Sequence, residues 1–279
     1  MTVSQREKAA KFHALHKRPG AFVIPNPWDG GTARILASLG FEALATTSAG
    51  LAFTLGRRDA ESAITRDEVL LNARAIVEAT DLPVSADLES GFGDAPHDVA
   101  QTIRLAAETG LVGGSVEDAT YDPRCPIYDP SEAVERVAAA VEAARSFPFA
   151  FVLTARAENF LFDRPDLDDT VRRLQAFEAA GADVLYAPGL PDLDAIRVVC
   201  ASVSRPVNVV IGLQGQAFAV DELAEVGVRR ISLGSTLCRA AFGAFLRAAR
   251  EIRDRGTFAF VADAVSFADV NALMAPGEP

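Results

Sequence analysis

Two pairs of carboxylate residues stand at the ends of short apolar segments in this sequence. Asp87 and Glu89, spaced i, i+2, follow one such segment and precede a glycine turn, while Glu117 and Asp118 follow another. If the two segments are neighbouring parallel strands, these carboxylates meet in one mouth. Several carboxylates in a small space repel each other unless a hard cation lies among them. The spacing therefore predicts a magnesium-dependent enzyme, with Mn²⁺ as the alternative ion.

The size and charge of the chain narrow the class of protein. Its 279 residues, 49% hydrophobic, are enough for one large domain, predicted here to span residues 1–279. A net charge of −11 argues against nucleic acid or an anionic membrane surface as a partner. No apolar segment reaches the roughly 18 residues that cross a bilayer, and residues 1–17 do not resemble a secretory signal. Three cysteines without framework spacing indicate reduced thiols in the cytoplasm.

Short apolar segments alternate along the chain with amphipathic, alanine-rich segments. The eight predicted strands are residues 21–24, 43–47, 83–87, 113–117, 150–155, 183–187, 207–211 and 230–233. The predicted helices between them are residues 30–39, 66–79, 96–109, 131–145, 167–180, 192–202, 220–226 and 236–254. The alternation predicts a closed (β/α)8 TIM barrel. An open doubly wound sheet is the alternative, but no G-x-G-x-x-G motif follows the first strand.

Two further helices are predicted outside the eight units. Residues 4–17 form a polar-faced helix that could cap the bottom of the barrel. Residues 257–273 form an extra C-terminal helix with a broad apolar face. That face either packs back on its own barrel or is buried against another subunit, which would make the protein a homo-oligomer, a dimer or a tetramer.

The active site of a (β/α)8 barrel lies at the C-terminal ends of its strands. Besides the acids, that end presents Arg156 after the fifth strand, Asn208 on the seventh, and Ser48-Ala49-Gly50 after the second. Carboxylates with Mg²⁺ bind an oxyanion, whereas a guanidinium and backbone N–H groups bind a carboxylate. This combination suits a small carboxylate substrate whose enolate is stabilised by the metal.

Five motifs follow one another along the chain: Asn26-Pro27-Trp28-Asp29, Thr47-Ser48-Ala49-Gly50-Leu51, Asp87-Leu88-Glu89-Ser90-Gly91-Phe92-Gly93, Val116-Glu117-Asp118 and Thr154-Ala155-Arg156. Their order and spacing resemble those of the isocitrate lyase/phosphoenolpyruvate mutase superfamily, over nearly the whole chain. The third and fourth motifs together are specific. The resemblance implies a (β/α)8 barrel, Mg²⁺, tetramers with a swapped C-terminal helix, and cleavage or formation of C–C or P–C bonds.

The resemblance also implies a role for each matching residue. Asp87 would bind Mg²⁺ directly, and its waters would be held by Asp59, Glu89 and Glu117. The substrate carboxylate would be bound by Ser48, the backbone of Ala49 and Gly50, and Arg156.

The chain departs from the superfamily in the loop after the fourth strand. The lyases carry a K-[KR]-C-G-H motif there, whose cysteine is the catalytic acid. Here Arg124-Cys125 is kept, but prolines flank it and the lysine, glycine and histidine are missing. Cys125 is therefore either a catalytic residue or an exposed thiol without a role. Residues 119–128 are predicted to form a mobile gate over the mouth.

The acids and Arg156 also have a plainer interpretation. Asp87 and Glu89 could form structural salt bridges with arginines, and Arg156 could serve only to neutralise the acids. Three functions remain open on the sequence. They are an Mg²⁺-dependent C–C lyase or decarboxylase of a 2-oxo or 2-hydroxy di- or tricarboxylic acid, a phosphonopyruvate-type P–C mutase or hydrolase, and a non-enzymatic barrel that binds a 2-oxo acid.

Overall fold

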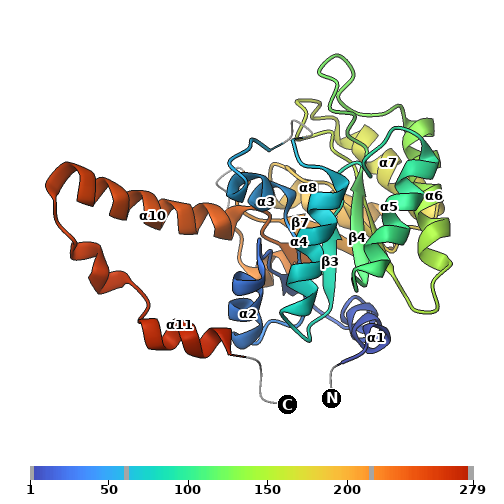
Figure 1. The fold of residues 1–279 in the computed structure, drawn as a ribbon. Helices are drawn as coiled ribbons and strands as arrows, with labels where there is room; N and C mark the ends of the chain where they lie inside the picture. The colour runs from blue at the N-terminus through green and yellow to red at the C-terminus, as the bar shows by residue number, and fades with distance from the viewer. Residues whose placement is uncertain (1–2, 60–62, 214–216, 276–279) are drawn as a thin grey trace.

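Eight parallel strands surround a common interior (Figure 1). The computed structural model describes residues 3–59, 63–213 and 217–275. The strands are β1 (Phe22–Ile24), β2 (Leu44–Ala45), β3 (Val84–Asp87), β4 (Gly113–Glu117), β5 (Val152–Arg156), β6 (Val184–Tyr186), β7 (Val207–Val210) and β8 (Arg230–Ser232). They pair in the order β1-β8-β7-β6-β5-β4-β3-β2. The N–H of Ala45 donates to the carbonyl of Pro25 at 3.1 Å and brings β2 to the end of β1. The predicted (β/α)8 barrel is confirmed, in a nearly closed form.

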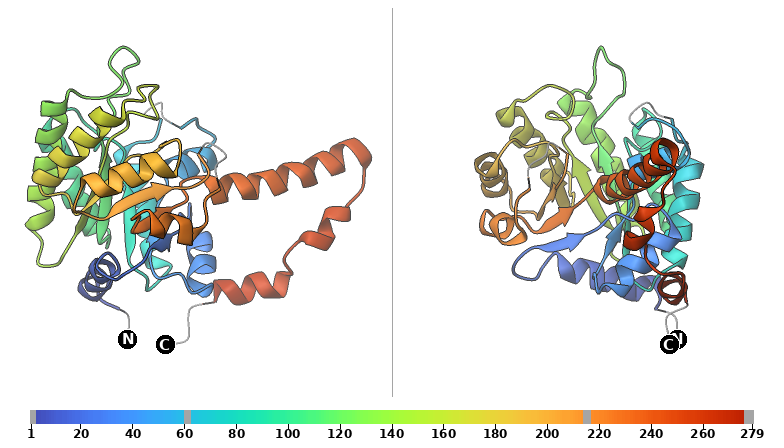
Figure 2. Two further views of the ribbon diagram at one scale, coloured as in Figure 1. Left: turned by 180° about the vertical axis from the view of Figure 1, so that it is seen from behind. Right: turned by 90° about the vertical axis from the view of Figure 1, so that its left-hand side faces the viewer.

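Helices follow the strands and cover the outside of the barrel (Figure 2). They are α1 (Gln5–Leu15), α2 (Gly30–Ser38), α3 (Ser48–Thr54), α4 (Arg66–Glu78), α5 (Pro96–Glu108), α6 (Pro130–Arg145), α7 (Leu167–Ala179), α8 (Leu193–Ser202), α9 (Val220–Glu225), α10 (Thr236–Arg255), the 3-10 helix η1 (Ala259–Asp263) and α11 (Phe267–Met274). Apart from α3, which was not predicted, the helices from α1 to α10 confirm the predicted ones, with ends shifted by at most two residues. None of the helices within the described ranges is long and apolar enough to cross a membrane.

Local sequence signals explain where helices begin and end. Asp29 caps α2, because its carboxylate accepts a hydrogen bond from the N–H of Thr32 at 2.7 Å. Thr65 and Glu68 form the reciprocal capping box at the start of α4. At the other end of a unit, Gly110 adopts a φ of +94° and turns the chain from α5 toward β4, which a residue with a Cβ atom does only under strain.

Helix α1 closes the bottom of the barrel, as the sequence predicts. Phe12 is fully buried, and it packs in one apolar cluster with residues at the starts of the strands, including Phe22, Val152 and Val184. The interior of the barrel is therefore shielded from water at this end and open at the other, where the strand ends carry the polar residues.

The C-terminal segment departs from the expectation of one continuous helix over residues 257–273. Helix α10 ends at Gly256, whose φ is +64°, and η1 and α11 follow as separate pieces. The break has a local cause, because Ser266 caps α11 by accepting from the N–H of Asp269 at 3.1 Å. We call residues 236–275 the C-terminal arm. It projects from the barrel and returns so that the end of α11 reaches α2, where Arg34 donates to the carbonyl of Ala275 (Figures 1 and 2).

Candidate active site

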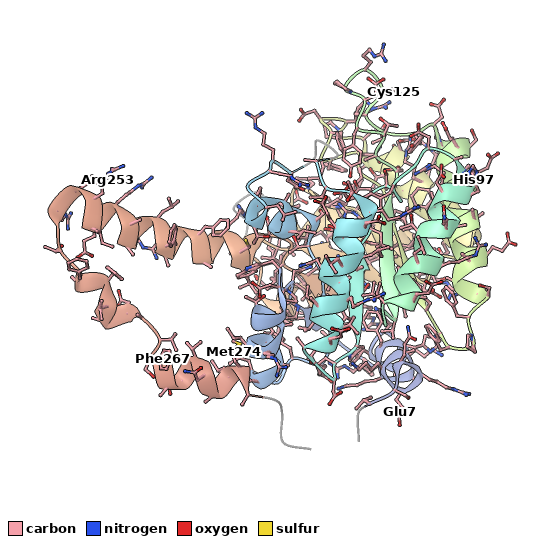
Figure 3. All side chains as sticks on the ribbon, viewed as in Figure 1. Glu7, His97, Cys125, Arg253, Phe267 and Met274 are labelled. Carbon is pink, nitrogen blue, oxygen red and sulfur yellow. The ribbon has the colours of Figure 1, made fainter. Side chains whose placement is uncertain are left out.

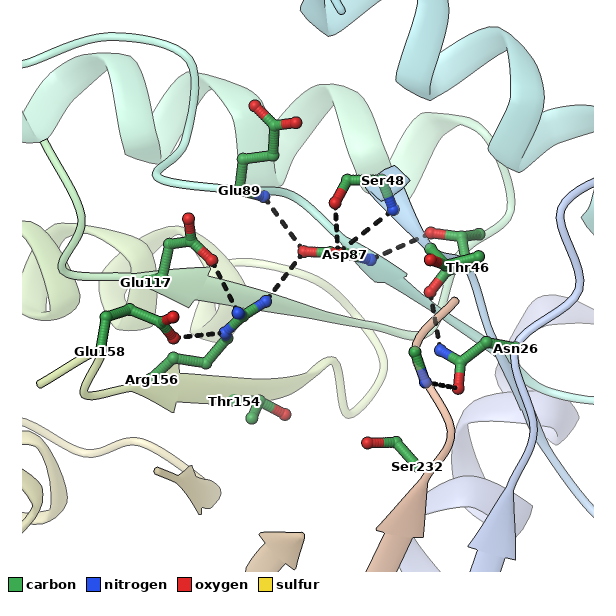
Figure 4. A network of polar contacts seen from close by, with 12 residues as sticks. Asn26, Thr46, Ser48, Asp87, Glu89, Glu117, Thr154, Arg156, Glu158 and Ser232 are labelled. Carbon is green, nitrogen blue, oxygen red and sulfur yellow. Dashed lines mark hydrogen bonds and ion pairs between the residues drawn. The ribbon is translucent and has the colours of Figure 1, made fainter. Parts of the chain in front are cut away.

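Asp87 lies at the centre of a polar network at the end of β3 (Figure 4). One carboxylate oxygen accepts from the hydroxyl of Ser48 at 2.8 Å and from its N–H at 3.2 Å. The backbone N–H of Asp87 donates to the hydroxyl of Thr46 at 3.0 Å. These contacts tie the ends of β2 and β3 together and fix the orientation of the Asp87 carboxylate.

Arg156, at the end of β5, is surrounded by carboxylates (Figure 4). Its nitrogens lie 3.2 Å from Asp87, 2.9 Å from Glu117 and 2.8 Å from Glu158. Its guanidinium also lies over the ring of Tyr186, 5.0 Å from the ring centre. The structure thus brings together the predicted residues of β3, β4 and β5, and Arg156 neutralises the acids, as the plainer interpretation of the sequence expects. Glu158 completes the cluster, although the sequence alone gave it no role.

The cluster holds more negative charge than Arg156 can offset. Glu89 follows β3 in the left-handed region, with a φ of +48°, and is only 7% exposed. Burial, and then repulsion by Asp87 and Glu117, raises the pKa of Glu89 to about 8. Burial likewise raises the pKa of Glu117, although Arg156 opposes this shift. The site therefore favours one further positive charge, from protons or from a metal ion.

The donor set of the cluster fits a hard divalent cation. Mg²⁺ takes oxygen ligands, commonly one or two carboxylates, and keeps several waters. Within residues 3–59, 63–213 and 217–275 no three acidic, histidine or cysteine side chains converge closely enough to ligate one ion directly. The set implied by the resemblance, in which Asp87 alone binds the ion directly and other carboxylates act through water, stays a prediction. Asp59 is exposed on the rim, and its charge contributes to the raised pKa of Glu89.

The segment after β2 differs from the expected loop. Ser48, Ala49 and Gly50 form the first residues of α3, a helix that the sequence analysis did not predict because seven residues are too short for a helical period. Thr47 caps α3 by accepting from the N–H of Gly50 at 3.2 Å. A Cβ atom at Gly50 would come within 2.6 Å of the Thr47 methyl group. This position therefore requires glycine, and α3 presents its N-terminal end toward Asp87.

The loop after β4 directs Tyr121, and not Cys125, into the site. The hydroxyl of Tyr121 donates to the carboxylate of Glu117. Cys125 is exposed near the outer tip of the loop, where its thiol donates to the carbonyl of Ile127 at 3.5 Å (Figure 3). The prediction of Cys125 as a catalytic residue finds no support in this arrangement. Tyr121 was missed because its sequence context shows no motif, and only the folding of the loop reveals it.

Antiparallel contacts hold the base of this loop. Ala119 pairs with Ile127, and the N–H of Tyr128 donates to the carbonyl of Asp118 at 2.8 Å. Beneath them lies a buried ion pair, in which Arg173 contacts Asp118 at 3.0 Å. The loop thus has a fixed base and an exposed tip. Its proposed motion as a gate stays a prediction.

Asn208 lies below the cluster, inside the barrel. It is 1% exposed, and its amide group donates to the hydroxyl of Ser232 at 3.0 Å. A cavity of about 60 Å³ extends from Asp87 and Arg156 down to Asn208 and Arg230. Of the candidate substrate residues, Asp87, Arg156 and Asn208 therefore line one continuous space, whose lining does not include Ser48, Ala49 or Gly50.

The fold is a (β/α)8 barrel, and the acid–arginine cluster lies at the strand ends, where barrel enzymes have their active sites. A family model described as phosphoenolpyruvate phosphomutase matches residues 12–253. The chain belongs to this family, within the phosphoenolpyruvate mutase/isocitrate lyase superfamily.

Proteins similar to this chain have several different activities. It is 31% identical over 225 residues to a 2-methylisocitrate lyase of Shewanella oneidensis, covering 78% of this chain and 75% of that protein. A crystal structure of a protein from Burkholderia cenocepacia J2315, described as a lyase/mutase, is 59% identical in sequence, with a TM-score of 0.96 over 98% of both chains. The structure of oxaloacetate acetylhydrolase with oxalate is 25% identical, with a TM-score of 0.88 over 98% of this chain and 95% of that one.

Proposed function

We propose that this protein is an Mg²⁺-dependent lyase or decarboxylase that cleaves a C–C bond of a 2-oxo or 2-hydroxy di- or tricarboxylic acid. The observation that carries the proposal is the cluster around Asp87, in which three carboxylates share a single guanidinium, that of Arg156, among the residues that the structure describes. Lyases and a hydrolase of such acids among the relatives support the same class of reaction.

In this proposal the residues of the cluster have the roles that the family resemblance implies for them. Asp87 would hold Mg²⁺ directly, and Asp59, Glu89 and Glu117 would hold its waters. Mg²⁺, when bound, supplies electrostatic stabilisation of the oxyanion that develops during C–C cleavage. Arg156 binds the substrate carboxylate through its planar fork, together with Ser48 and the backbone of Ala49 and Gly50.

Tyr121 restricts access to the site from the side of the loop. Its ring and the side chain of Glu89 also line an outer hollow of about 450 Å³. This hollow offers room for the part of a larger substrate that extends away from Arg156. Excluding water there would protect an enolate from premature protonation.

Phosphonate chemistry is the second candidate, because the matching family model is described as phosphoenolpyruvate phosphomutase. A catalytically inactive barrel that binds a 2-oxo acid is the non-enzymatic alternative. Incubation with oxaloacetate, 2-methylisocitrate or phosphonopyruvate, with and without EDTA, separates the three. Product from either of the first two acids that requires Mg²⁺ supports the lyase. If phosphonopyruvate is the only one of these acids that gives a product, the lyase proposal is contradicted. If the acids bind but none is turned over, the protein is a binding protein.

We also propose that the C-terminal arm packs on a second copy of the chain, giving a dimer or a tetramer. Large apolar side chains on the arm are exposed, among them Phe258 at 63%, Val265 at 65% and Phe267 at 87%. Patches of this kind commonly mark interfaces. A cytoplasmic location stays a prediction from the sequence.

A further inference from the structure

Arg230 is a buried cation without a carboxylate partner among the residues that the structure describes. It begins β8, is 5% exposed, and points into the barrel. Its nitrogens donate to Asn208 Oδ1 at 2.8 Å and to Thr154 Oγ1 at 2.9 Å. Both partners are neutral, so the charge of Arg230 is solvated by dipoles but not balanced by an anion.

The third partner of Arg230 is also neutral. Its Nη1 lies 3.4 Å from Nε2 of His16, which accepts because the other ring nitrogen faces the carbonyl of Phe12 at 2.8 Å. Burial and the charge of Arg230 lower the pKa of His16 to about 3, so that the ring stays neutral. Burial also lowers the pKa of Arg230 to about 10, whereas Tyr186 opposes this shift. A buried charge of this kind is costly unless an anion joins it.

The cavity above Arg230 has the size and position for one carboxylate. Its volume of about 60 Å³ is several times the roughly 10–15 Å³ that one water molecule needs. Its lining changes from Arg156 and Asp87 at the top to Arg230 and Asn208 at the bottom. Thr154, which contacts Arg230, stands two residues before Arg156 on β5, a rise of about 7 Å (Figure 4). Two cations thus line the same cavity, Arg156 toward the strand ends and Arg230 deeper in the barrel, as the recognition of a dicarboxylate requires.

We propose that this cavity is a subsite for the second carboxylate of a short-chain dicarboxylate, and that Arg230 determines the preference for such substrates. The inference rests on the proposed function, in which Arg156 binds the first carboxylate. On binding, the anion accepts hydrogen bonds from the Arg230 fork, and Asn208 holds the fork in place. A monocarboxylate of the same chain length leaves Arg230 unbalanced and therefore binds more weakly.

Calorimetric titration with malate and 2-hydroxybutyrate in the presence of Mg²⁺ tests the subsite, because the two acids share the 2-hydroxy acid group and the four-carbon chain. We expect the wild type to bind malate about 10- to 100-fold more tightly, the range of a charge-assisted contact. Arg230→Met should lose this preference by weakening malate alone, and Arg230→Lys should keep part of it. Arg229→Met is the matched control, because Arg229 lines a surface hollow on the other side with His13 and Lys17.

Each outcome decides a separate point. Equal affinity of the wild type for both acids, or equal weakening of both in Arg230→Met, overturns the subsite but leaves the proposed function standing. No binding of either acid to the wild type overturns the subsite as well, and the assay with oxaloacetate and 2-methylisocitrate then decides the proposed function by itself. If Arg230→Met does not fold, the comparison of wild type with Arg230→Lys decides, and an unchanged malate preference in the lysine variant overturns the role of the fork.

Discussion

Arg156 contacts three carboxylates, so its substitution tests whether it serves the substrate or only the acids. We expect Arg156→Lys to keep the fold and the Mg²⁺ affinity but to weaken 2-oxo acid binding by about 2–3 kcal/mol, because an ammonium cannot reproduce the bidentate fork. Titration with Mg²⁺ and then with oxaloacetate measures both. Arg145→Lys is the control, since Arg145 pairs with Asp183 at the surface at 2.6 Å. Lost metal binding with retained acid affinity would make Arg156 structural.

His16 gives the stability of the protein a dependence on pH. Its pKa is lowered to about 3 by burial and by Arg230, so unfolding allows it to take up a proton at any pH between that value and its usual 6.5. The stabilisation that the neutral His16 ring gives the folded state is complete above pH 6.5 and is lost as the pH falls from 6.5 toward 3. We expect His16→Phe to reduce the loss of unfolding free energy between pH 7 and pH 5 by about 1–2 kcal/mol. Urea unfolding at both pH values, with His13→Phe as the control, measures it. An unchanged pH dependence in His16→Phe would contradict the assignment.

Asp87, Glu89, Glu117 and Arg156 could be predicted as one cluster from the sequence. Each stands at or just after the end of a predicted strand, and parallel strands of a barrel end on the same side. Tyr121 could not be predicted in this way. It reaches Glu117 through the path of an irregular loop, in which it adopts a φ of +61°. Nothing in the residue types of the loop distinguishes the inward Tyr121 from the outward Cys125.

At the scale of elements, the loop after β4 combines a fixed base with an exposed tip. The side chain of Arg124 is 88% exposed. We expect limited trypsin digestion to cleave after Arg124, and Mg²⁺ with a 2-oxo acid to slow the cleavage, because a bound ligand would hold Tyr121 and with it the loop. Quantifying the fragments over time, with 2-oxo acid alone as the control, measures the effect. Equal cleavage rates in all conditions would contradict a gate.

The strands and the long helices were predictable because apolar segments and caps agree with each other along the sequence. The second strand is shorter than predicted, Leu44–Ala45 instead of residues 43–47, because the chain turns into α3 directly after it. Short helices such as α3 and η1 span too few residues for a period to appear. Their boundaries depend on contacts with the rest of the fold.

At the scale of the whole molecule, the C-terminal arm is the part whose large apolar side chains the barrel leaves exposed. The sequence showed its apolar residues but could not place them, because a helical pattern does not indicate whether the partner lies in the same chain. In the structure α11 returns to α2 by its end, while Phe267 stays 87% exposed (Figure 3). The apolar face thus remains available to another copy.

We expect Phe267→Ser to shift the protein toward monomers, because burying a phenylalanine side chain contributes about 1.5–3 kcal/mol per copy. Light scattering coupled to size exclusion, across a range of concentrations, measures the mass. Val198→Ser on α8, where Val198 is 45% exposed, is the matched control. A wild type that is monomeric at all concentrations, or a variant with an unchanged dissociation constant, would contradict assembly through the arm.

The central claim is that a metal ion at Asp87 makes the cluster a C–C cleaving site. Pyruvate release tests it most directly, because both decarboxylation of oxaloacetate and cleavage of 2-methylisocitrate yield pyruvate. We expect release above the uncatalysed rate from one of these acids, its loss with EDTA, its return with Mg²⁺, and its absence in Asp87→Ala, which should also fail to bind Mg²⁺. Release that persists in EDTA, or full activity in Asp87→Ala, would contradict a metal-dependent site at Asp87.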